Sequence, residues 1–359
     1  MHHRRLASLT AFGVVVAGLT SPTPAAGQAA APSRKSTPPI AAMTPWTPPR
    51  TPEGQPDLQG IWVNNSATPL ERPQALQGRQ SLTDAEVAML KERAAQLLAD
   101  SNNDFPAGDN LFLAALAGVA QYKNPNATDN ALAMDAKEFD NRTSLIVDPP
   151  EGRIPWTREG KQRFDAANAN RLALAPEGPE ALPIEVRCIT YGVPRLGLAN
   201  FNSAGTLGYY QIVQAQGYVI LLYEAIHEAR IIPLDGRPHL PESVRSWIGD
   251  SRGRWEGETL VVETTNFLQQ SSVMGSNGGT FRLVERFTRI AAGEIRYEMT
   301  LSDPATWTRP WTVMIRLRAS RTPIYEYACH EGNAAIMEDI FTAARALDKA
   351  GKDADGRPR

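Results

Sequence analysis

Residues 281–301, FRLVERFTRIAAGEIRYEMTL, decide the fold class of this chain. Apolar and polar side chains alternate over 281–290 and again over 294–301, the period of two that is typical of a half-buried strand. Ala292-Gly293 lies between the two runs and predicts a tight hairpin turn. The stretch therefore predicts two antiparallel strands in one sheet.

Further short runs rich in β-branched and aromatic residues occur on both sides of this hairpin, separated by Gly, Pro and Asp. They predict strands at 144–147, 209–213, 218–223, 230–233, 259–264 and 312–317. The sequence has no strand–helix alternation, no GxGxxG motif and no Walker loop, so a nucleotide-binding α/β fold is not expected.

Helices are expected outside this β-rich region. Thr83 and Glu86 form a capping box before a helix at 85–98, and a second helix is expected at 111–119. Together they predict a helical insertion at about 80–125 in a single β-rich domain, 56–350. A C-terminal helix at 333–350 and a polar tail, 351–359, complete the expected organisation.

The N-terminal residues predict export. A basic start, an apolar run from Leu6 to about Leu19 and small residues near Gly27 indicate a cleavable signal peptide, 1–27. Residues 28–55 are rich in Pro and Ala and predict a flexible tether. The apolar run is shorter than the roughly 20 residues that span a bilayer. The mature protein is therefore expected to be periplasmic or secreted and to lack a membrane span.

The chain has two cysteines, Cys188 and Cys329. Lone thiols in an oxidising compartment usually pair, so a Cys188–Cys329 disulfide is expected, with two separate buried thiols as the alternative. The formal net charge of −2 and the absence of basic runs argue against nucleic acid as a partner. A small-molecule substrate or ligand is the expected partner.

Three histidines follow the signal peptide, and each lies in a polar cluster. His227 and His330 are the candidate acid–base residues, because histidine titrates near neutral pH. Glu331 follows His330 at the start of the expected helix, where it could take part in catalysis or only cap the helix. Arg230 could bind a carboxylate or phosphate, or form only a surface ion pair.

Glu285 is a carboxylate on an apolar strand face. The period of two places it on the same side as Phe281, Leu283 and Phe287. A carboxyl group buried in an apolar interior takes up a proton more readily than in water, as a general acid or base near neutral pH requires. The alternative is a buried partner for an arginine, without chemistry.

Candidate substrate-binding residues are polar or aromatic side chains near the expected strand ends: Arg230, Arg237, His239, Asp250, Arg254, Trp307 and Trp311. The segment 249–259 is dense in charge and glycine and predicts either a ligand-facing rim or a solvated turn. The two tryptophans could stack on an aromatic or sugar ligand, or fill the end of a barrel. The sequence lacks HExxH and any redox cofactor motif, so no metal and no cofactor is expected.

Two resemblances bear on the fold. Gly60-Ile61-Trp62 resembles the Gly-x-Trp that opens the first strand of lipocalin-type barrels. Longer motifs resemble a large family of uncharacterised exported bacterial proteins: IHEARIIPLDGRPHLP at 226–241, GDSRGRWEGETLVVETTNF at 249–267 and YEYACHEGN at 325–333. The family has no established activity to transfer. The resemblances imply an extracytoplasmic location and an antiparallel lipocalin-like (calycin-type) barrel, a fold that holds a ligand inside.

These observations predict an exported, cofactor-independent lyase, isomerase or hydrolase that acts on a small organic, for example aromatic, molecule in a barrel cavity. His227 and His330 would transfer protons, and Glu285 would be the interior carboxylate. The alternative is a periplasmic binding or carrier protein without catalysis. Convergence of the two histidines and a buried carboxylate on one cavity favours the enzyme, and separate positions favour the carrier.

Overall fold

The computed structural model describes residues 46–99, 110–119, 137–171, 180, 182, 184–194, 208–271 and 273–351. The expected signal peptide, residues 28–45 of the expected tether, part of the helical insertion and residues 352–359 of the tail lie outside the described residues. The elements described below all belong to one unit, Trp46–Arg359.

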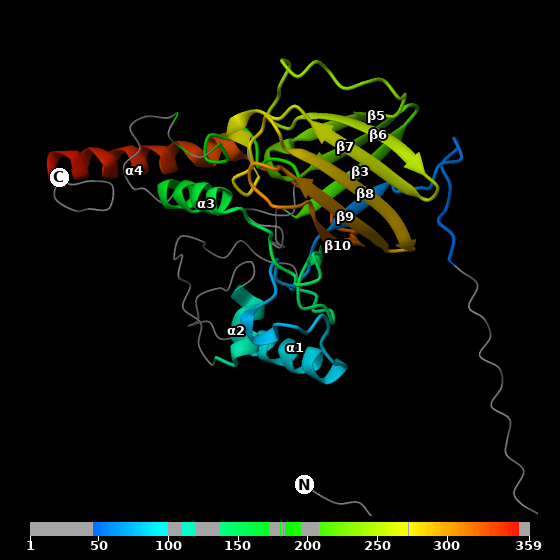
Figure 1. The fold of residues 1–359 in the computed structure, drawn as a ribbon, viewed down its shortest axis with the longest axis horizontal. Coiled ribbons are helices and arrows are strands. Elements are labelled where there is room, and N and C mark those ends of the chain that lie inside the picture. Colours follow the sequence, from blue (N-terminus) through cyan, green and yellow to red (C-terminus); the bar gives the residue numbers. More distant parts are fainter. Residues whose placement is uncertain are drawn as a thin grey trace, which may run out of the picture. The chain divides into compact units, whose positions relative to one another are not determined.

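The described strands form one antiparallel sheet that curls into a nearly closed barrel of nine strands (Figure 1). The order is β5-β4-β3-β1-β10-β9-β8-β7-β6, and the short β2 pairs with β10 outside this path. The strands are β1 (Gly60–Val63), β2 (Ile146–Asp148), β3 (Tyr209–Ala215), β4 (Tyr218–Tyr223), β5 (Ala229–Pro233), β6 (Asp250–Glu256), β7 (Thr259–Thr265), β8 (Arg282–Ala291), β9 (Glu294–Ser302) and β10 (Trp311–Ala319). The predicted lipocalin-like β-barrel is confirmed.

The hairpin predicted from 281–301 is β8 and β9, which pair from Arg282 opposite Ser302 to Ala291 opposite Glu294. The interior face of β8 carries Leu283, Glu285 and Phe287, all at most 3 % exposed. Phe287 stacks on Tyr297 of β9 with ring centroids 4.3 Å apart. The period of two therefore identified the buried face of both strands.

The Gly-x-Trp segment forms β1, which lies between β3 and β10. Trp62 is 1 % exposed, and its indole nitrogen donates a hydrogen bond of 2.9 Å to the Leu58 carbonyl. The Arg289 guanidinium lies 5.4 Å from the centroid of its ring, within the range of a cation–π contact. Trp62 thus ties β1 to the end of β8.

The barrel closes imperfectly where the edge strands β5 and β6 meet. A Cβ atom added at Gly253 of β6 would lie 2.6 Å from Leu234 Cδ2 and 2.8 Å from Ile232 Cγ2. Only a residue without a side chain leaves room for this approach. The lack of a side chain at Gly253 therefore lets the side chains of Ile232 and Leu234 pack against the backbone of β6 at the seam between the two edge strands.

We expect Gly253→Val to lower the free energy of unfolding by about 1–3 kcal/mol, because the added methyl groups overpack the seam. Urea unfolding followed by tryptophan fluorescence measures the change. Gly293→Val is the matched control, since the nearest atom to its added Cβ would be 3.8 Å away. Equal effects of the two substitutions would contradict the proposed close packing at Gly253.

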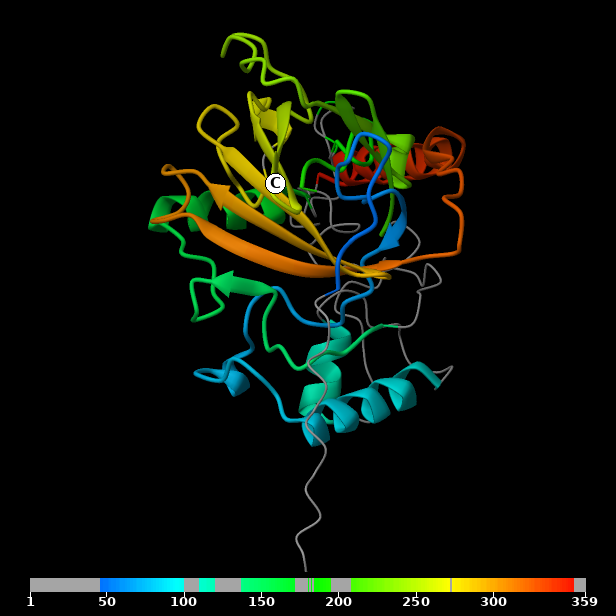
Figure 2. The same ribbon diagram turned by 90° about the vertical axis from the view of Figure 1, so that its right-hand side faces the viewer.

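The helices lie outside the barrel wall (Figures 1 and 2). They are α1 (Asp84–Ala99), α2 (Asn110–Ala117), α3 (Arg158–Arg171) and α4 (Cys329–Lys349), with short 3-10 turns η1 (Gln74–Leu76), η3 (Ala225–His227) and η4 (Gln269–Ser271). The predicted capping box is present: the Thr83 amide donates to Glu86 Oε2 at 2.8 Å, and the Glu86 amide donates to Thr83 Oγ1 at 3.3 Å. Among the described residues, no helix combines the length and apolar character needed to cross a membrane.

Three elements differ from the prediction. The segment 249–259 was expected to be a rim or a solvated turn, but most of it is strand β6, with Ser251 and Gly253 facing inward and Arg254 facing outward. Small inward residues at a seam give no hydrophobic alternation, so the pattern of this strand is weak. Helix α3 was not predicted at all, and α4 begins at Cys329, four residues before the expected start at 333.

Candidate functional site

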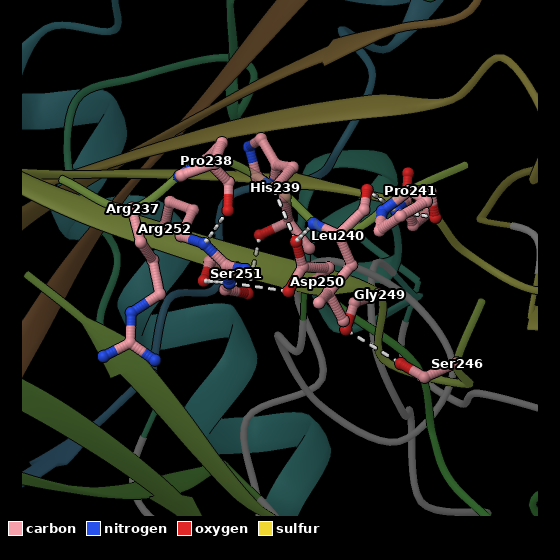
Figure 3. A network of polar contacts seen from close by, with 12 residues as sticks. Arg237, Pro238, His239, Leu240, Pro241, Ser246, Gly249, Asp250, Ser251 and Arg252 are labelled. Atoms are coloured by element: carbon pink, nitrogen blue, oxygen red, sulfur yellow. Dashed lines mark hydrogen bonds and ion pairs between the residues drawn. The ribbon is translucent and has the colours of Figure 1, made fainter. Parts of the chain in front are cut away.

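His239 and Asp250 form a polar pair at the edge of the barrel (Figure 3). His239 lies in the loop that joins β5 to β6, and Asp250 is the first residue of β6. The His239 Nδ1 and Asp250 Oδ2 atoms are 2.8 Å apart. The side chain of His239 is 27 % exposed and that of Asp250 is 11 % exposed, so the imidazole remains open to solvent while its partner is mostly buried.

Two further donors hold the Asp250 carboxylate. The Leu240 amide donates to Oδ2 at 3.0 Å, and Arg252 Nη1 donates to Oδ1 at 2.6 Å. We refer to His239, Leu240, Asp250 and Arg252 as the Asp250 cluster. Burial by itself raises the pKa of the Asp250 carboxyl, but the Leu240 amide, the His239 ring and Arg252 together lower the pKa below its ordinary value. Asp250 is therefore ionised at neutral pH.

The loop is held in place by local turns. The Arg237 amide donates to Asp235 Oδ1 at 3.1 Å, and Gly236 between them has φ +74°, as expected for an Asx-type turn. Asn266, which follows β7, donates from its side-chain amide to the Leu240 and Pro241 carbonyls at 2.9 and 3.2 Å. Arg252 Nε donates to the Pro238 carbonyl at 3.0 Å. The His239 backbone is therefore braced on both sides.

This arrangement sets the chemistry of the His239 ring. An ionised carboxylate can only accept hydrogen bonds, so Nδ1 carries the proton and Nε2 carries the lone pair. Nε2 makes no hydrogen bond to the described part of the chain. A carboxylate that fixes the tautomer and stabilises the protonated ring is the feature that lets histidine act as a general base.

Glu285 faces the barrel interior, as predicted, and is 0 % exposed. Its partner is Arg230 of β5, which is 2 % exposed and contacts both carboxylate oxygens. The Tyr297 hydroxyl donates to Glu285 Oε1 at 2.5 Å, and Arg230 Nη1 lies 3.4 Å from the Tyr223 hydroxyl. Glu285 is thus the buried arginine partner that the sequence left open as the alternative to acid–base chemistry, and Arg230 lies in the interior instead of on a surface.

Arg230 and Tyr297 of this buried network both have raised pKa values. Burial lowers the pKa of the Arg230 guanidinium, but the adjacent Glu285 carboxylate together with Tyr223 and Tyr297 outweighs burial, so the pKa lies above its ordinary value. Burial, followed by the negative charge of Glu285, raises the pKa of the Tyr297 phenol well above its usual range. Arg230 therefore stays cationic and Tyr297 stays a hydrogen-bond donor, which is a structural arrangement linking β5, β8 and β9.

His227 lies in η3 and is exposed. Ile226 and His227 both have a left-handed backbone, with φ 58° and 50°, a conformation that is costly for a β-branched residue. The turn places His227 Nε2 3.0 Å from the Tyr327 amide, from which it accepts a hydrogen bond. The Nε2 lone pair of His227 is therefore occupied by the segment that leads into α4.

The Cys188–Cys329 disulfide is present, as predicted, and joins the 184–194 segment to the first residue of α4. The 184–194 segment also meets the residues before α4 through the Tyr191 and Tyr327 hydroxyls, 2.9 Å apart, and Thr190 of the same segment donates to Glu228, next to His227, at 2.9 Å. The 184–194 segment therefore holds both Glu228, the residue after His227, and the residues that lead into α4.

His330 and Glu331 occupy the first turn of α4, and both are exposed. Neither has a hydrogen bond to the described residues. His227 and His330 lie on segments that touch, but Glu285 belongs to the separate interior network with Arg230. The predicted convergence of these histidines with a buried carboxylate is therefore not found.

The remaining candidates lie apart from one another. Arg237 pairs with Asp235, is half-exposed and points away from the Asp250 cluster (Figure 3). Arg254 pairs with Glu256 and Glu263 on the outer face of the barrel. Trp307 and Trp311 are at most 2 % exposed and pack edge to face with centroids 5.4 Å apart. The tryptophans therefore fill the barrel core, which was the alternative to ligand stacking.

Sequence reasoning named His239 and Asp250 separately but did not pair them, and it missed the Leu240 amide and Asn266. One signal for Asn266 was available in the sequence, because it directly follows a β-rich run and precedes an aromatic residue. Asparagine tolerates the left-handed backbone that the structure shows at this position, φ 58°. Within the described parts of the chain, no group of three or more His, Cys, Asp or Glu residues could hold a metal ion.

No protein-family model, curated protein or solved structure matches this chain. The resemblance to exported bacterial proteins accordingly stays a prediction.

Proposed function

We propose that the protein is an exported, cofactor-independent enzyme that acts on a small organic molecule, with His239 as the residue that transfers the proton. The observation that carries the proposal is the 2.8 Å contact between His239 Nδ1 and the ionised Asp250 carboxylate, which leaves the basic Nε2 unbonded. The N-terminal sequence and the disulfide support export. The proposal moves the catalytic role from His227 and His330 to His239.

Arg252 gives the proposed site a means to bind an anionic substrate. It contacts Asp250 Oδ1 while His239 contacts Oδ2, so the guanidinium and the imidazole lie on opposite oxygens of one carboxylate. Its Nη2 group makes no hydrogen bond to the described residues. A carboxylate on the substrate could bind there while Nε2 takes a proton from a neighbouring carbon, nitrogen or water. Such a proton transfer fits a lyase, an isomerase or a hydrolase.

We expect His239→Gln to lower kcat/KM by about 10²–10⁴-fold, the usual contribution of a general acid or base. A substrate is first identified by incubating the purified protein with a periplasmic small-molecule extract and finding, by mass spectrometry, a compound that is consumed. Asp250→Asn should also lower kcat/KM, because an amide no longer fixes the tautomer of the ring.

The variant His330→Gln tests whether His330, in the first turn of α4, transfers the proton instead of His239. The exposed side chain of His330 is expected to be dispensable for turnover. Loss of turnover in His330→Gln with full activity in His239→Gln would overturn the assignment of the site. Circular dichroism of each variant verifies that its fold is intact.

A binding or carrier protein without catalysis is the second candidate. It is favoured by the positions of the histidines, since none of them contacts Glu285 and His239 lies apart from His227. In that case a compound from the extract would co-purify with the protein unchanged in mass, and His239→Gln would leave its binding unaltered.

A further inference from the structure

A cleft of about 490 Å³ lies outside the barrel, between the η1 region and the turn that follows β2. Its volume falls in the range of small-molecule sites, roughly 300–1,000 Å³. It is lined by Arg72, Gln74, Gln77, Gly78, Gln80, Pro150, Glu151 and Arg153. We call it the Arg72 cleft. It shares no residue with the Asp250 cluster.

Arg72 is the unusual member of this lining, because it is a charged residue that is only 5 % exposed. Its Nε donates to Thr143 Oγ1 at 2.9 Å, and its Nη1 donates to the Pro150 carbonyl at 2.8 Å. Both acceptors are neutral. The guanidinium has no carboxylate partner among the described residues. A buried charge without a counter-ion is costly to the fold.

The third nitrogen of Arg72 is free. Nη2 makes no hydrogen bond to the described chain, yet it is not enclosed by protein, since it is not among the buried unpaired atoms. Arg72 is one of the residues that line the cleft. The lining thus includes a cation that has no carboxylate partner among the described residues.

The surrounding structure holds Arg72 in this position. The Thr143 hydroxyl that accepts from Nε is itself donated to the Arg79 carbonyl at 2.6 Å, and the Arg72 amide donates to the Gly152 carbonyl at 2.8 Å. A Cβ atom at Gly152, which has φ +66°, would lie 3.0 Å from Arg72 Cζ. A glycine here therefore admits the guanidinium, which is fixed before any ligand arrives.

The rest of the lining suits a hydroxylated molecule. Gln74, Gln77 and Gln80 are exposed, and each amide both donates and accepts hydrogen bonds, as sugar hydroxyls require. Arg153 lies at the rim, with its side chain 48 % exposed and 3.9 Å from Glu71. Glu151 is the one acidic residue of the lining and is exposed, and the lining carries two arginines, Arg72 and Arg153, so its net charge is positive.

We propose that the Arg72 cleft binds a small hydroxylated anion, an acidic or phosphorylated sugar, through Arg72 Nη2. The oxyanion completes the hydrogen bonding of the guanidinium and neutralises its charge, and the glutamine amides bind the hydroxyl groups. A carboxylate and a phosphate share this chemistry, and the experiment distinguishes them.

The test is calorimetric titration of the purified full-length protein with D-glucuronate, D-glucose 6-phosphate and D-glucose. At least one of the two anions is expected to bind about tenfold more tightly than glucose, the usual gain from a charge-assisted hydrogen bond. The tighter of the two identifies a carboxylate or a phosphate as the anion. Equal binding of glucose and both anions, or no binding of either anion at about 10 mM, would overturn the proposal.

Two variants assign the binding to the cleft. Arg72→Gln is expected to weaken anion binding about tenfold or more while leaving glucose unaffected. Since this residue is buried and its loss could impair folding, Gln77→Glu provides a surface change that places a negative charge in the lining, and it is expected to weaken anion binding severalfold. Arg254→Gln, on β6 outside the cleft, is the matched control. Unchanged affinity in a folded Gln77→Glu protein would contradict the assignment.

Discussion

Arg230→Met is expected to lower the free energy of unfolding by about 3–5 kcal/mol, because it leaves the Glu285 carboxylate buried without its cation. Glu285 is 0 % exposed and, among the described residues, retains only the Tyr297 hydroxyl as a hydrogen-bond donor in that variant. Such a loss is a large share of the roughly 5–15 kcal/mol by which proteins are stable. Urea unfolding followed by circular dichroism measures it.

Arg254→Met is the matched control, because Arg254 also pairs with a glutamate on the same barrel. Its contact with Glu263, 2.6 Å long, joins side chains that are 50 % and 43 % exposed, and solvent reduces the value of such a pair to below about 1 kcal/mol. Adding Glu285→Leu to Arg230→Met should restore part of the lost stability, since no unpaired charge then remains. Equal costs for Arg230→Met and Arg254→Met would show that burial does not set the value of these pairs.

The double substitution Cys188→Ala/Cys329→Ala is expected to lower the free energy of unfolding by about 2–5 kcal/mol. The disulfide joins residues separated by 141 positions, so its loss frees a long loop in the unfolded chain. Helix α4 should be affected first, because Ala344, 7 % exposed, is the buried hydrophobic residue among its described side chains. Urea unfolding measures the global effect, and amide hydrogen exchange over 329–349 measures the local one.

Reduction of the wild-type protein with dithiothreitol is the control for this variant and should give the same increase in exchange of α4. A hydrogen bond from the Asn333 side chain to the Val186 carbonyl also joins α4 to the 184–194 segment. Unchanged exchange in α4 after the disulfide is removed would show that packing, and not the disulfide, holds the helix in place.

Local patterns predicted most of the strands. Tyr218–Tyr223 was predicted with its observed bounds, and Thr259–Thr265 and Glu294–Ser302 extend one residue beyond the prediction. These strands have one face buried in the barrel, so their sequences alternate and the period can be recognised. β6 was missed because two of its inward residues, Ser251 and Gly253, carry no hydrophobic signal, and Trp255 is the one large apolar side chain on that face.

The candidate residues were found more readily than their partners. Glu285 was placed on the correct face, but Arg230 comes from β5, which meets it only because the barrel curls the edge strand around. Arg72, which was not predicted as a site residue, contacts Thr143, 71 positions away. No pattern within either segment indicates a contact of this kind, since it depends on how distant segments pack.

The sequence by itself determined that 281–301 forms an antiparallel hairpin, that the domain is rich in β-strands, and that Cys188 and Cys329 are the one pair available for a disulfide, whereas the barrel was implied by the resemblance to lipocalin-type proteins. Side-chain periodicity and turn residues act over a few neighbouring positions, and two cysteines allow one pairing. Only the tertiary structure decided which charged residues meet: Arg230 with Glu285 in the interior, and His239 with Asp250 at the edge of the barrel. Burial and the position of a counter-charge govern the chemistry of such groups, and both are properties of the assembled barrel.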